Sequence, residues 1–390
     1  MINARQEEKN MDFSLTKEQE FVRKMVREFA INEVEPIAAE IDKEHRFPAE
    51  TIPKLARYGL LGVPFPREYE GAGGDNVSYA ITIEELSRVC ATTAVICSAN
   101  ISLCGWPIFY FGMDEQKSKY LPDLASGRKL GAFGLTEPNA GSDAAGQQTR
   151  AVDMGDHWLI NGTKIFITNG GVADTFVIFA MTDKAKKTRG ISAFIIERSF
   201  EGFSNGKNED KMGICGSSTS ELVFQNMKVP KENMLGRPGD GFKIAMATLD
   251  GGRIGIGAQA LGIAQGALDV TIEYMKARKQ FGKRLVDMDP LRFDIAEMAT
   301  RIEAARLLIY KAAYLKDSGQ PYGQWAAMGK YYASEVAMAT TTKCVQLHGG
   351  YGYTKDYPVE RMMRDAKITE LYEGTTEVQK MVVAASVIGR

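Results

Sequence analysis

Apolar side chains recur with a helical period near the start of the chain. In the segment 22–30 they form one stripe at steps of three and four, at Val22, Met25, Val26, Phe29 and Ala30. Thr16 and Gln19 have the spacing of a capping box, so we expect a helix to begin there. Pro36 is expected to kink or restart that helix. The Gly-rich segment 64–75 predicts a loop, and a helical pattern resumes over 84–101.

The last part of the chain also has a helical pattern. In the segment 292–316 the apolar positions alternate steps of three and four, as in a helix bundle, at Ile295, Met298, Ile302, Ala305, Ile309 and Ala312. The segment 325–347 predicts a second long helix. The segment 254–267 carries no charge and is rich in Gly and Ala, so we expect a buried helix in close contact with a neighbour.

The middle of the chain has the pattern of strands. Two β-favouring stretches lie on either side of Asn161-Gly162 within 157–168, which predicts a hairpin because both turn positions of that type need positive φ. Further strands are predicted at 175–181, 191–197 and 220–224. No helix of 10–15 residues separates them, which favours an antiparallel sheet over βαβ units.

The order of these patterns predicts an α+β fold with three domains. The expected bounds are 1–125 for an N-terminal helical domain, 126–240 for a central antiparallel β domain, and 241–390 for a C-terminal helical bundle.

The segment 89–113 has no charged side chain and is long enough to span a bilayer. Polar residues interrupt it, and Gly105-Trp106-Pro107 is expected to break a helix. We therefore expect a buried helix followed by a turn, and no membrane insertion. The first residues of the chain carry acidic side chains and no apolar core, which fits neither a secretory signal nor a transit peptide.

Cys90, Cys97 and Cys104 recur every seven residues. On one helix their Cα atoms would be about 10.5 Å apart, too far for a disulfide or a shared zinc ion. We expect buried thiols on one helix face and no metal site, and five scattered cysteines suit a reducing cytoplasm.

Charge and simple motifs exclude several functions. The 48 Lys and Arg balance 49 Asp and Glu, whereas a nucleic-acid-binding protein usually has a basic excess. The three histidines are far apart in the sequence, with no metal-ligand spacing. The segment 255–260 loosely matches a dinucleotide fingerprint, but that fingerprint needs a preceding strand. Because 242–249 has a helical pattern, an NAD-dependent Rossmann dehydrogenase is only a remote alternative.

Several segments rich in Gly, Thr, Ser and Asn remain: GLTEPNAGSDA (134–144), 166–171, 346–352 and LYEGTTE (371–377). Together they resemble the acyl-CoA dehydrogenase family, closest to its short-chain, butyryl-CoA-type branch. The resemblance runs from Met11 to the end, so 1–10 is expected to be a short extension. It implies a helical domain, a β domain and a C-terminal four-helix bundle, with FAD bound between the last two in a homotetramer.

By this resemblance Glu373 is the catalytic base. It would remove the α-proton of a short or compact acyl-CoA thioester while the β-hydrogen passes as hydride to flavin N5. A carboxyl group with an ordinary pKa is a weak base, so we expect burial by the bound substrate to raise the pKa of Glu373. In some relatives the base lies instead at the position of Gly252, so this chain offers one base.

The resemblance also implies the binding residues. The expected FAD contacts are Phe133, Leu135, Thr136, Gly141, Ser142, Phe166, Ile167, Thr168, Thr375 and Glu377. The segment that reaches the FAD of a neighbouring subunit is expected to comprise Arg278, Gln280, Phe281, Gln346, Leu347, Gly349 and Gly350. Substrate contacts are expected from Ser142, Asp250, Arg253, Tyr372 and Gly374, and the pocket floor from 96–102 and the helix after Phe242.

The chain departs from the family at Asp289 and Arg292, where relatives commonly carry Gln. A carboxylate would repel flavin phosphates, so Asp289 is not expected to make the contact that Gln makes in relatives. Pro290 is expected to start the following helix. The resemblance implies an electron-transferring flavoprotein as the redox partner. Alternatives are an enzyme working mainly as an enoyl-CoA reductase, one acting on cyclic or branched acyl groups, or a relative such as a nucleic-acid-binding flavoprotein or a nitroalkane oxidase. The last would be expected to carry Asp at position 373.

Overall fold

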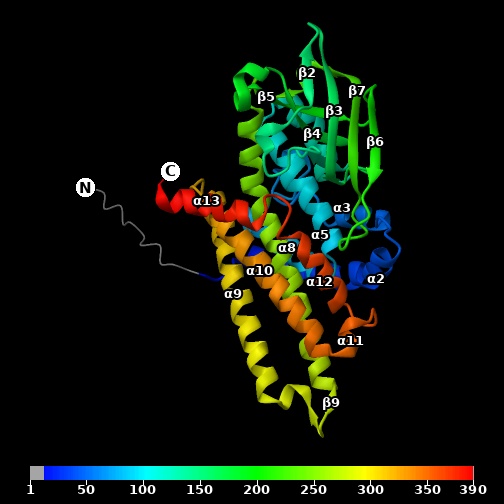
Figure 1. The fold of residues 1–390 in the computed structure, drawn as a ribbon, viewed down its shortest axis with the longest axis vertical. Coiled ribbons are helices and arrows are strands. Elements are labelled where there is room, and N and C mark those ends of the chain that lie inside the picture. The colour runs from blue at the N-terminus through cyan, green and yellow to red at the C-terminus, as the bar shows by residue number, and fades with distance from the viewer. Residues whose placement is uncertain (1–12, 390) are drawn as a thin grey trace, which may run out of the picture.

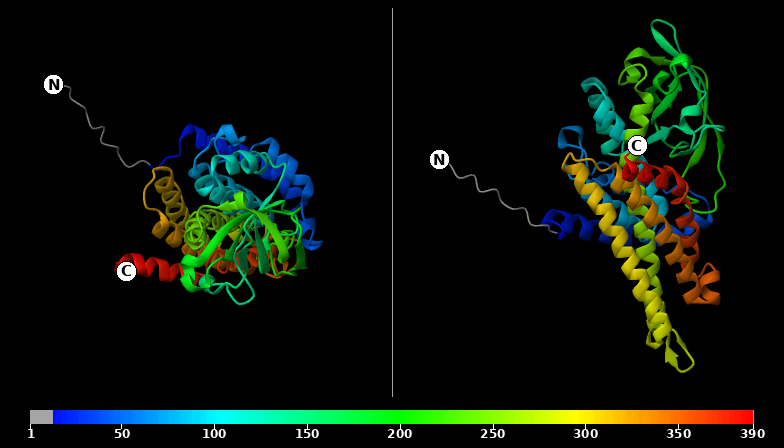
Figure 2. Two further views of the ribbon diagram at one scale, coloured as in Figure 1. Left: turned by 90° about the horizontal axis from the view of Figure 1, so that it is seen from above. Right: turned by 60° about the vertical axis from the view of Figure 1, so that its left-hand side comes forward.

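The computed structural model describes residues 13–389, so the predicted extension 1–10 lies outside the described residues. The sheet forms one end of an elongated molecule and the connection between α8 and α9 forms the other (Figures 1 and 2). Thr16 caps the first helix: its hydroxyl accepts from the Gln19 N–H, and the Gln19 side chain accepts from the Thr16 N–H, which confirms the capping box. The N-terminal helices are α1 Lys17–Phe29, α2 Glu35–Lys43, α3 Ile52–Arg57, α4 Asn76–Ser87, α5 Ala91–Ser98, α6 Trp106–Phe111 and α7 Asp114–Ala125.

The predicted break after Gly105 is wrong. The helical winding widens over Ala99–Gly105, where the Trp106 N–H donates to the carbonyl of Ile101, and α6 continues in the same direction. Pro107 lies in the first turn of α6, where its missing N–H costs little. Among the described residues, Ala91–Phe111 alone is long and apolar enough to cross a membrane, but 83% of its most apolar window is buried inside the protein.

The three regularly spaced cysteines are free, buried thiols, as predicted. Cys90, however, has an extended backbone just before α5, so the helix expected over 84–101 is interrupted there and the thiols do not share one helix face. Among residues 13–389 no group of His, Cys, Asp or Glu side chains could hold a metal ion.

The central sheet has the order β6-β7-β3-β2-β4-β5-β8, with β1 beside β4. Most neighbours are antiparallel, as predicted, but β4 pairs in parallel with β1 and briefly with β2. The strands are β1 Gly131–Gly134, β2 Arg150–Asp153, β3 His157–Thr168, β4 Thr175–Met181, β5 Ile191–Glu197, β6 Phe203–Asn208, β7 Thr219–Pro230 and β8 Met234–Leu235.

The hairpin predicted at Asn161-Gly162 is wrong, because β3 runs straight through this pair. The pairing register with β7 shifts between Ile160 and Gly162. Asn161 accepts a hydrogen bond from the Asn226 N–H at 2.8 Å, which stabilises the irregularity. A Cβ at Gly162 would lie 2.5 Å from Thr149 Oγ1. The pair therefore serves a bulge and a close strand approach rather than a turn.

The C-terminal bundle is built on α8, whose glycines allow close packing against α4. A Cβ at Gly262 would lie 2.2 Å from the carbonyl oxygen of Glu84, and one at Gly266 would lie 2.0 Å from that of Arg88. The predicted close helix contact is thus confirmed. The elements are α8 Gly241–Ala277, β9 Lys279–Gln280, β10 Lys283–Arg284, α9 Asp289–Asp317, α10 Gly323–His348, α11 Gly350–Tyr353, α12 Val359–Ile368 and α13 Thr376–Ile388.

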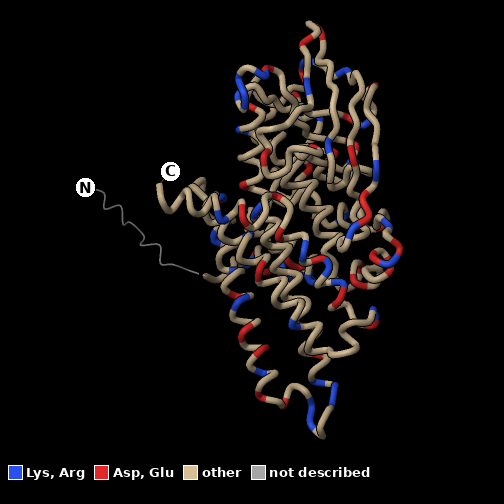
Figure 3. Tube along the Cα trace, viewed as in Figure 1, with Lys and Arg blue, Asp and Glu red and all other residues tan. Residues whose placement is uncertain are grey.

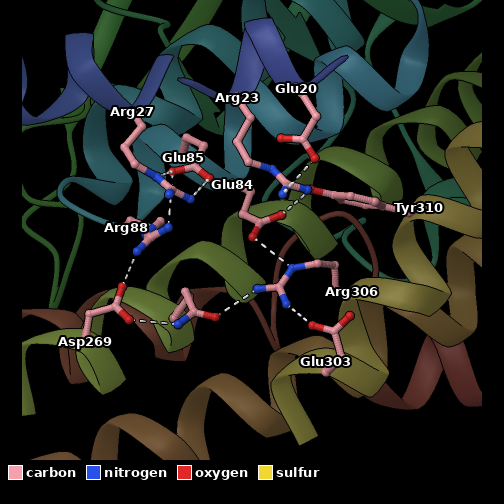
Figure 4. A network of polar contacts seen from close by, with 11 residues as sticks. Glu20, Arg23, Arg27, Glu84, Glu85, Arg88, Asp269, Glu303, Arg306 and Tyr310 are labelled. Carbon is pink, nitrogen blue, oxygen red and sulfur yellow. Dashed lines mark hydrogen bonds and ion pairs between the residues drawn. The ribbon is translucent and has the colours of Figure 1, made fainter. Parts of the chain in front are cut away.

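A network of ion pairs also joins the N-terminal helices to the bundle (Figure 4). Glu84 and Glu85 on α4 are both buried. Glu85 accepts from Arg27 of α1 at 2.7 Å and 2.9 Å, while Glu84 accepts from Arg306 of α9 at 3.1 Å and from Tyr310 at 2.6 Å. Each buried carboxylate is therefore paired, which offsets its desolvation.

Asn100 joins the N-terminal helices to the sheet. Its side chain is fully buried, donates to the carbonyls of Leu61 and Leu124 at 3.1 Å each, and accepts from the Gly131 N–H at 2.9 Å. One amide thus satisfies three backbone groups from three segments, at the start of β1.

Replacing Asn100 with Ala should lower the free energy of unfolding by roughly 2–5 kcal/mol, because three buried backbone groups lose their partner. Urea unfolding measures the effect, and Asn32→Ala, at an exposed position, is the control. Equal stability of the two variants would contradict this role for Asn100.

Candidate active site

Glu373 lies in the loop between α12 and α13, in a left-handed backbone conformation. Its φ is 50° and that of the following Gly374 is 90°. Thr375 then caps α13 by accepting from the Val378 N–H at 3.3 Å. The Thr376 N–H donates to the Glu370 carbonyl at 2.9 Å and closes the loop. This turn directs the Glu373 side chain toward α8.

The Glu373 carboxyl has an unusual environment. Its Oε2 atom is inaccessible to solvent and has no hydrogen-bond partner. Burial raises the pKa of Glu373 to about 7, against the opposing influence of the Lys330 and Arg253 charges. The raised pKa predicted from the sequence follows from desolvation even without a bound substrate.

Gly252 on α8 provides the space that this carboxyl occupies. A Cβ at Gly252 would lie 2.1 Å from Glu373 Oε2 and 3.1 Å from Leu103 Cδ2. The two positions at which relatives were expected to place a base therefore face each other in this chain, and only one carries a carboxyl group. Leu103 packs in the same cluster as Phe133 and Leu135, which links Glu373 to the start of the sheet.

Polar side chains surround the neighbouring part of α8. The hydroxyls of Tyr79 and Ser98 lie 2.9 Å apart, and a Cβ at Gly255 would lie 2.2 Å from the Tyr79 hydroxyl. The Tyr372 hydroxyl donates to Gln259. The segments predicted to form the pocket floor, 96–102 and α8, thus meet beside the loop that carries Glu373.

Asp250 and Arg253 flank Gly252 along α8 and form an ion pair across one turn of the helix. The Nε atom of Arg253 is buried and has no partner, while burial raises the pKa of Asp250. Sequence reasoning missed a cation beside them: the Lys316 Nζ atom lies 2.8 Å from the centroid of the Trp106 ring. Burial lowers the pKa of Lys316 well below its usual value.

Lys330 on α10 is a second cation that sequence reasoning missed. It is fully buried, and its ammonium group donates to the Gly374 carbonyl at 2.7 Å. The sequence does contain a signal, because Lys330 shares a helical stripe with the small residues Ala326, Ala327 and Ala333. A charged residue on such a stripe must be buried with the stripe, and therefore needs a partner.

The residues predicted to contact the flavin near the sheet lie on adjacent segments. The Ile165 N–H donates to the Thr136 carbonyl at 2.9 Å, which brings 133–136 beside 166–168. Phe166 sits at a register shift of β3 with φ 58°, and its ring is 60% exposed. Such an exposed aromatic ring beside hydroxyl side chains fits a planar, polar-edged group such as a flavin.

The loop after β1 is held by a buried ion pair that sequence reasoning also missed. Lys164 Nζ lies 2.8 Å from Glu137 Oε1, and Glu137 also accepts from the N–H groups of Gln148 and Thr149. Gly141 and Ser142 are exposed in this loop, and a Cβ at Gly141 would meet nothing within 4 Å. The Glu of the GLTEP segment thus anchors the loop and leaves its tip accessible.

The other predicted FAD contacts form a separate group at the opposite end of the bundle. A cavity of about 650 Å³ is lined there by residues that include Arg278, Gln280, Gln346, Leu347, Gly349 and Gly350. The buried Nε2 atom of His348, which also lines it, has no partner. Phe281 at the hairpin tip is 96% exposed, and basic residues flank it (Figure 3). The lining carries Arg278 and Lys343 against Asp294 and Asp356, and the Arg278 guanidinium has the donor geometry that binds a phosphate group.

Asp289 does not face this cavity as a free anion. It is the first residue of α9 and pairs with Arg292 at 3.1 Å. Pro290 lies in the first turn of α9, which confirms the predicted helix start. Thr375 and Glu377, predicted to contact FAD, lie at the cap and in the first turn of α13.

The chain matches known proteins along nearly its whole length. Three family models match: "Acyl-CoA dehydrogenase, N-terminal domain" over 16–128, "middle domain" over 132–227 and "C-terminal domain" over 239–388. The chain belongs to the acyl-CoA dehydrogenase family. It is therefore a flavoenzyme, with FAD as its cofactor.

Individual relatives are similar over their full length. The chain is 65% identical to the short-chain specific acyl-CoA dehydrogenase of Clostridium acetobutylicum, covering 97% of this chain and 100% of that protein. It is 48% identical to the caffeyl-CoA reductase–Etf complex subunit CarC of Acetobacterium woodii, covering 96% and 99%. The structure of butyryl-CoA dehydrogenase from Megasphaera elsdenii has a TM-score of 0.95 at 53% identity, covering 97% and 100%.

Replacing Gly252 with Ala should displace the Glu373 carboxyl and lower kcat roughly 100-fold, because the new methyl group occupies the position of Oε2. Steady-state dehydrogenation with an acyl-CoA series measures the effect. Gly257→Ala on the same helix is the control, since its Cβ meets the side chain of Ile309 no closer than 3.1 Å. Equal kcat values for the two variants would show that the site tolerates a methyl group at Gly252.

Proposed function

We propose that this protein dehydrogenates a short or compact acyl-CoA to the 2-enoyl-CoA, with Glu373 as the base. The observation that carries the proposal is the buried, unpartnered Oε2 atom of Glu373, which faces Gly252. Glu373 takes the α-proton as the carbon–carbon double bond forms. Bound FAD would supply the acceptor for the β-hydrogen, which leaves as hydride. The electron pair of the α-carbon–hydrogen bond becomes the double bond, and the β-hydrogen leaves with the pair of its own bond, so atoms and electrons balance.

The raised pKa of Glu373 suits this task. A base is most effective when its pKa lies near the working pH, since a much weaker base removes a proton poorly and a stronger one is already protonated. At about 7, a large fraction of Glu373 is ionised at neutral pH while it remains more basic than an exposed carboxylate. Leu103 beside Gly252 helps to exclude water from the reacting atoms.

The substrate and cofactor positions are assigned from the predicted residues. Asp250 and Arg253 would contact the CoA portion, with Ser142, Tyr372 and Gly374 near the thioester. The residues of 133–142 and 166–168, with Thr375 and Glu377, would hold the FAD of the same subunit. Because Arg278 and Gln346 lie in the separate cavity of the bundle, they would reach the FAD of a neighbouring subunit in a homotetramer.

The proposed redox partner is an electron-transferring flavoprotein. The relative named as a caffeyl-CoA reductase–Etf complex subunit supports this partner. Its name also supports a second candidate function, in which the same site works mainly in the direction of enoyl-CoA reduction. Microscopic reversibility gives Glu373 the opposite role in that direction, as the acid that protonates the α-carbon.

Replacing Glu373 with Gln should leave FAD bound but slow anaerobic flavin bleaching by butyryl-CoA about 10²–10⁴-fold, because no base remains. Stopped-flow absorbance measures bleaching, and the flavin-to-protein ratio reports FAD content. Glu335→Gln, which removes a carboxylate paired with Lys380 on the surface, is the control. Full retention of bleaching in Glu373→Gln would refute the proposed function.

The bleaching rate of the unaltered protein should rise with pH and level off above about 7, because only ionised Glu373 accepts the proton and its pKa lies there. The measurement is the second-order rate of bleaching at low butyryl-CoA across pH values on both sides of 7. A rate that stays constant through this range would contradict the assigned titration.

A further inference from the structure

We propose that Lys330 is a positioning residue for Glu373: together with Gln379, it holds the Glu373–Gly374 turn so that the carboxyl faces Gly252. This inference rests on the proposed role of Glu373 as the base. It assigns a function to two buried polar side chains that lie on different helices and take no part in the proton or hydride transfer.

The turn is held from two sides. From α10, the Lys330 ammonium donates to the Gly374 carbonyl at 2.7 Å. From α13, the Gln379 amide donates to the same carbonyl at 2.9 Å and to the Glu373 carbonyl at 3.1 Å. Lys330 and Gln379 are both fully buried. Two successive carbonyls of the turn are therefore fixed by donors that water cannot replace.

The backbone of this turn needs such support. Glu373 has φ 50° without being glycine, and Gly374 has φ 90°. A left-handed conformation at a residue with a side chain is unfavourable, and it persists only where its surroundings determine it. Without the two donors, the peptide that joins Glu373 to Gly374 is free to rotate. The carboxyl would then no longer be held against the space at Gly252.

Lys330 also acts on Glu373 through its charge. The ammonium lowers the pKa of Glu373 and so partly offsets the effect of burial, while burial lowers the pKa of Lys330 to about 8. Arg253 from α8 lowers the pKa of both groups, and Glu370 and Glu377, on either side of the turn, raise the pKa of Lys330. The charge of Glu373 in turn raises the pKa of Tyr79 on α4 and of the adjacent Tyr372. Gln379 is neutral, so it shares the hydrogen-bonding role of Lys330 without its charge.

Because only Lys330 carries a charge, replacing Lys330 and replacing Gln379 should change the pH profile differently. Lys330→Met should retain FAD but lower kcat at least about tenfold, with a smaller change in KM, because a misplaced base slows the chemical step. Its acidic limb in the pH profile should move to higher pH, since the positive charge is gone. Gln379→Met should also lower kcat, but its acidic limb should stay in place. A merely structural lysine would not move the pH limb.

The experiment measures steady-state kcat and KM with butyryl-CoA, and anaerobic bleaching against pH, in both variants and in Glu373→Gln, with flavin content and thermal unfolding as checks on folding. If Lys330→Met does not fold, Lys330→Gln keeps a donor without the charge, and its acidic limb should still move. A folded, FAD-loaded Lys330 variant with an unchanged kcat and pH limb overturns this inference alone. Activity in Glu373→Gln overturns the proposed function instead.

Discussion

The site depends on keeping one carboxyl oxygen, Oε2 of Glu373, out of water without a direct partner. Most buried carboxylates in this protein are paired, as Glu84, Glu85 and Glu137 are. Glu373 differs because its buried Oε2 atom makes no hydrogen bond. Such an arrangement costs stability, and it requires the neighbouring elements to hold the group in place. Gly252 supplies the space, and the α12–α13 turn supplies the direction.

Much of the fold could be predicted because its helices and strands carry clear periodic patterns. The stripe from Met298 to Ala312 is buried as expected, and β4 and β5 have the predicted bounds. The errors occur where a local signal has two structural uses. Asn161-Gly162 favours a turn, but the same freedom of the backbone accommodates a bulge where Thr149 approaches β3 closely. Likewise, Pro107 can end a helix or begin one.

The site residues were predicted by resemblance rather than by pattern, and their geometry required the structure. The sequence marks positions 252 and 373 as alternatives, but only the fold shows that they face each other. The buried lysines were missed for a related reason: a helical stripe identifies which residues are inside, but not which carbonyl or ring each one meets. Lys330 meets the Gly374 carbonyl 44 positions away, through packing that no local pattern encodes.

The composition of α8 has a consequence for how the chain folds. This helix of 37 residues contains seven glycines, and each glycine within a helix costs about 1 kcal/mol relative to alanine. An isolated α8 would therefore be a poor helix. Its order comes from α4 and the rest of the bundle, which approach where side chains are missing. The N-terminal helices and the C-terminal bundle therefore form one cooperative unit rather than two independently stable modules.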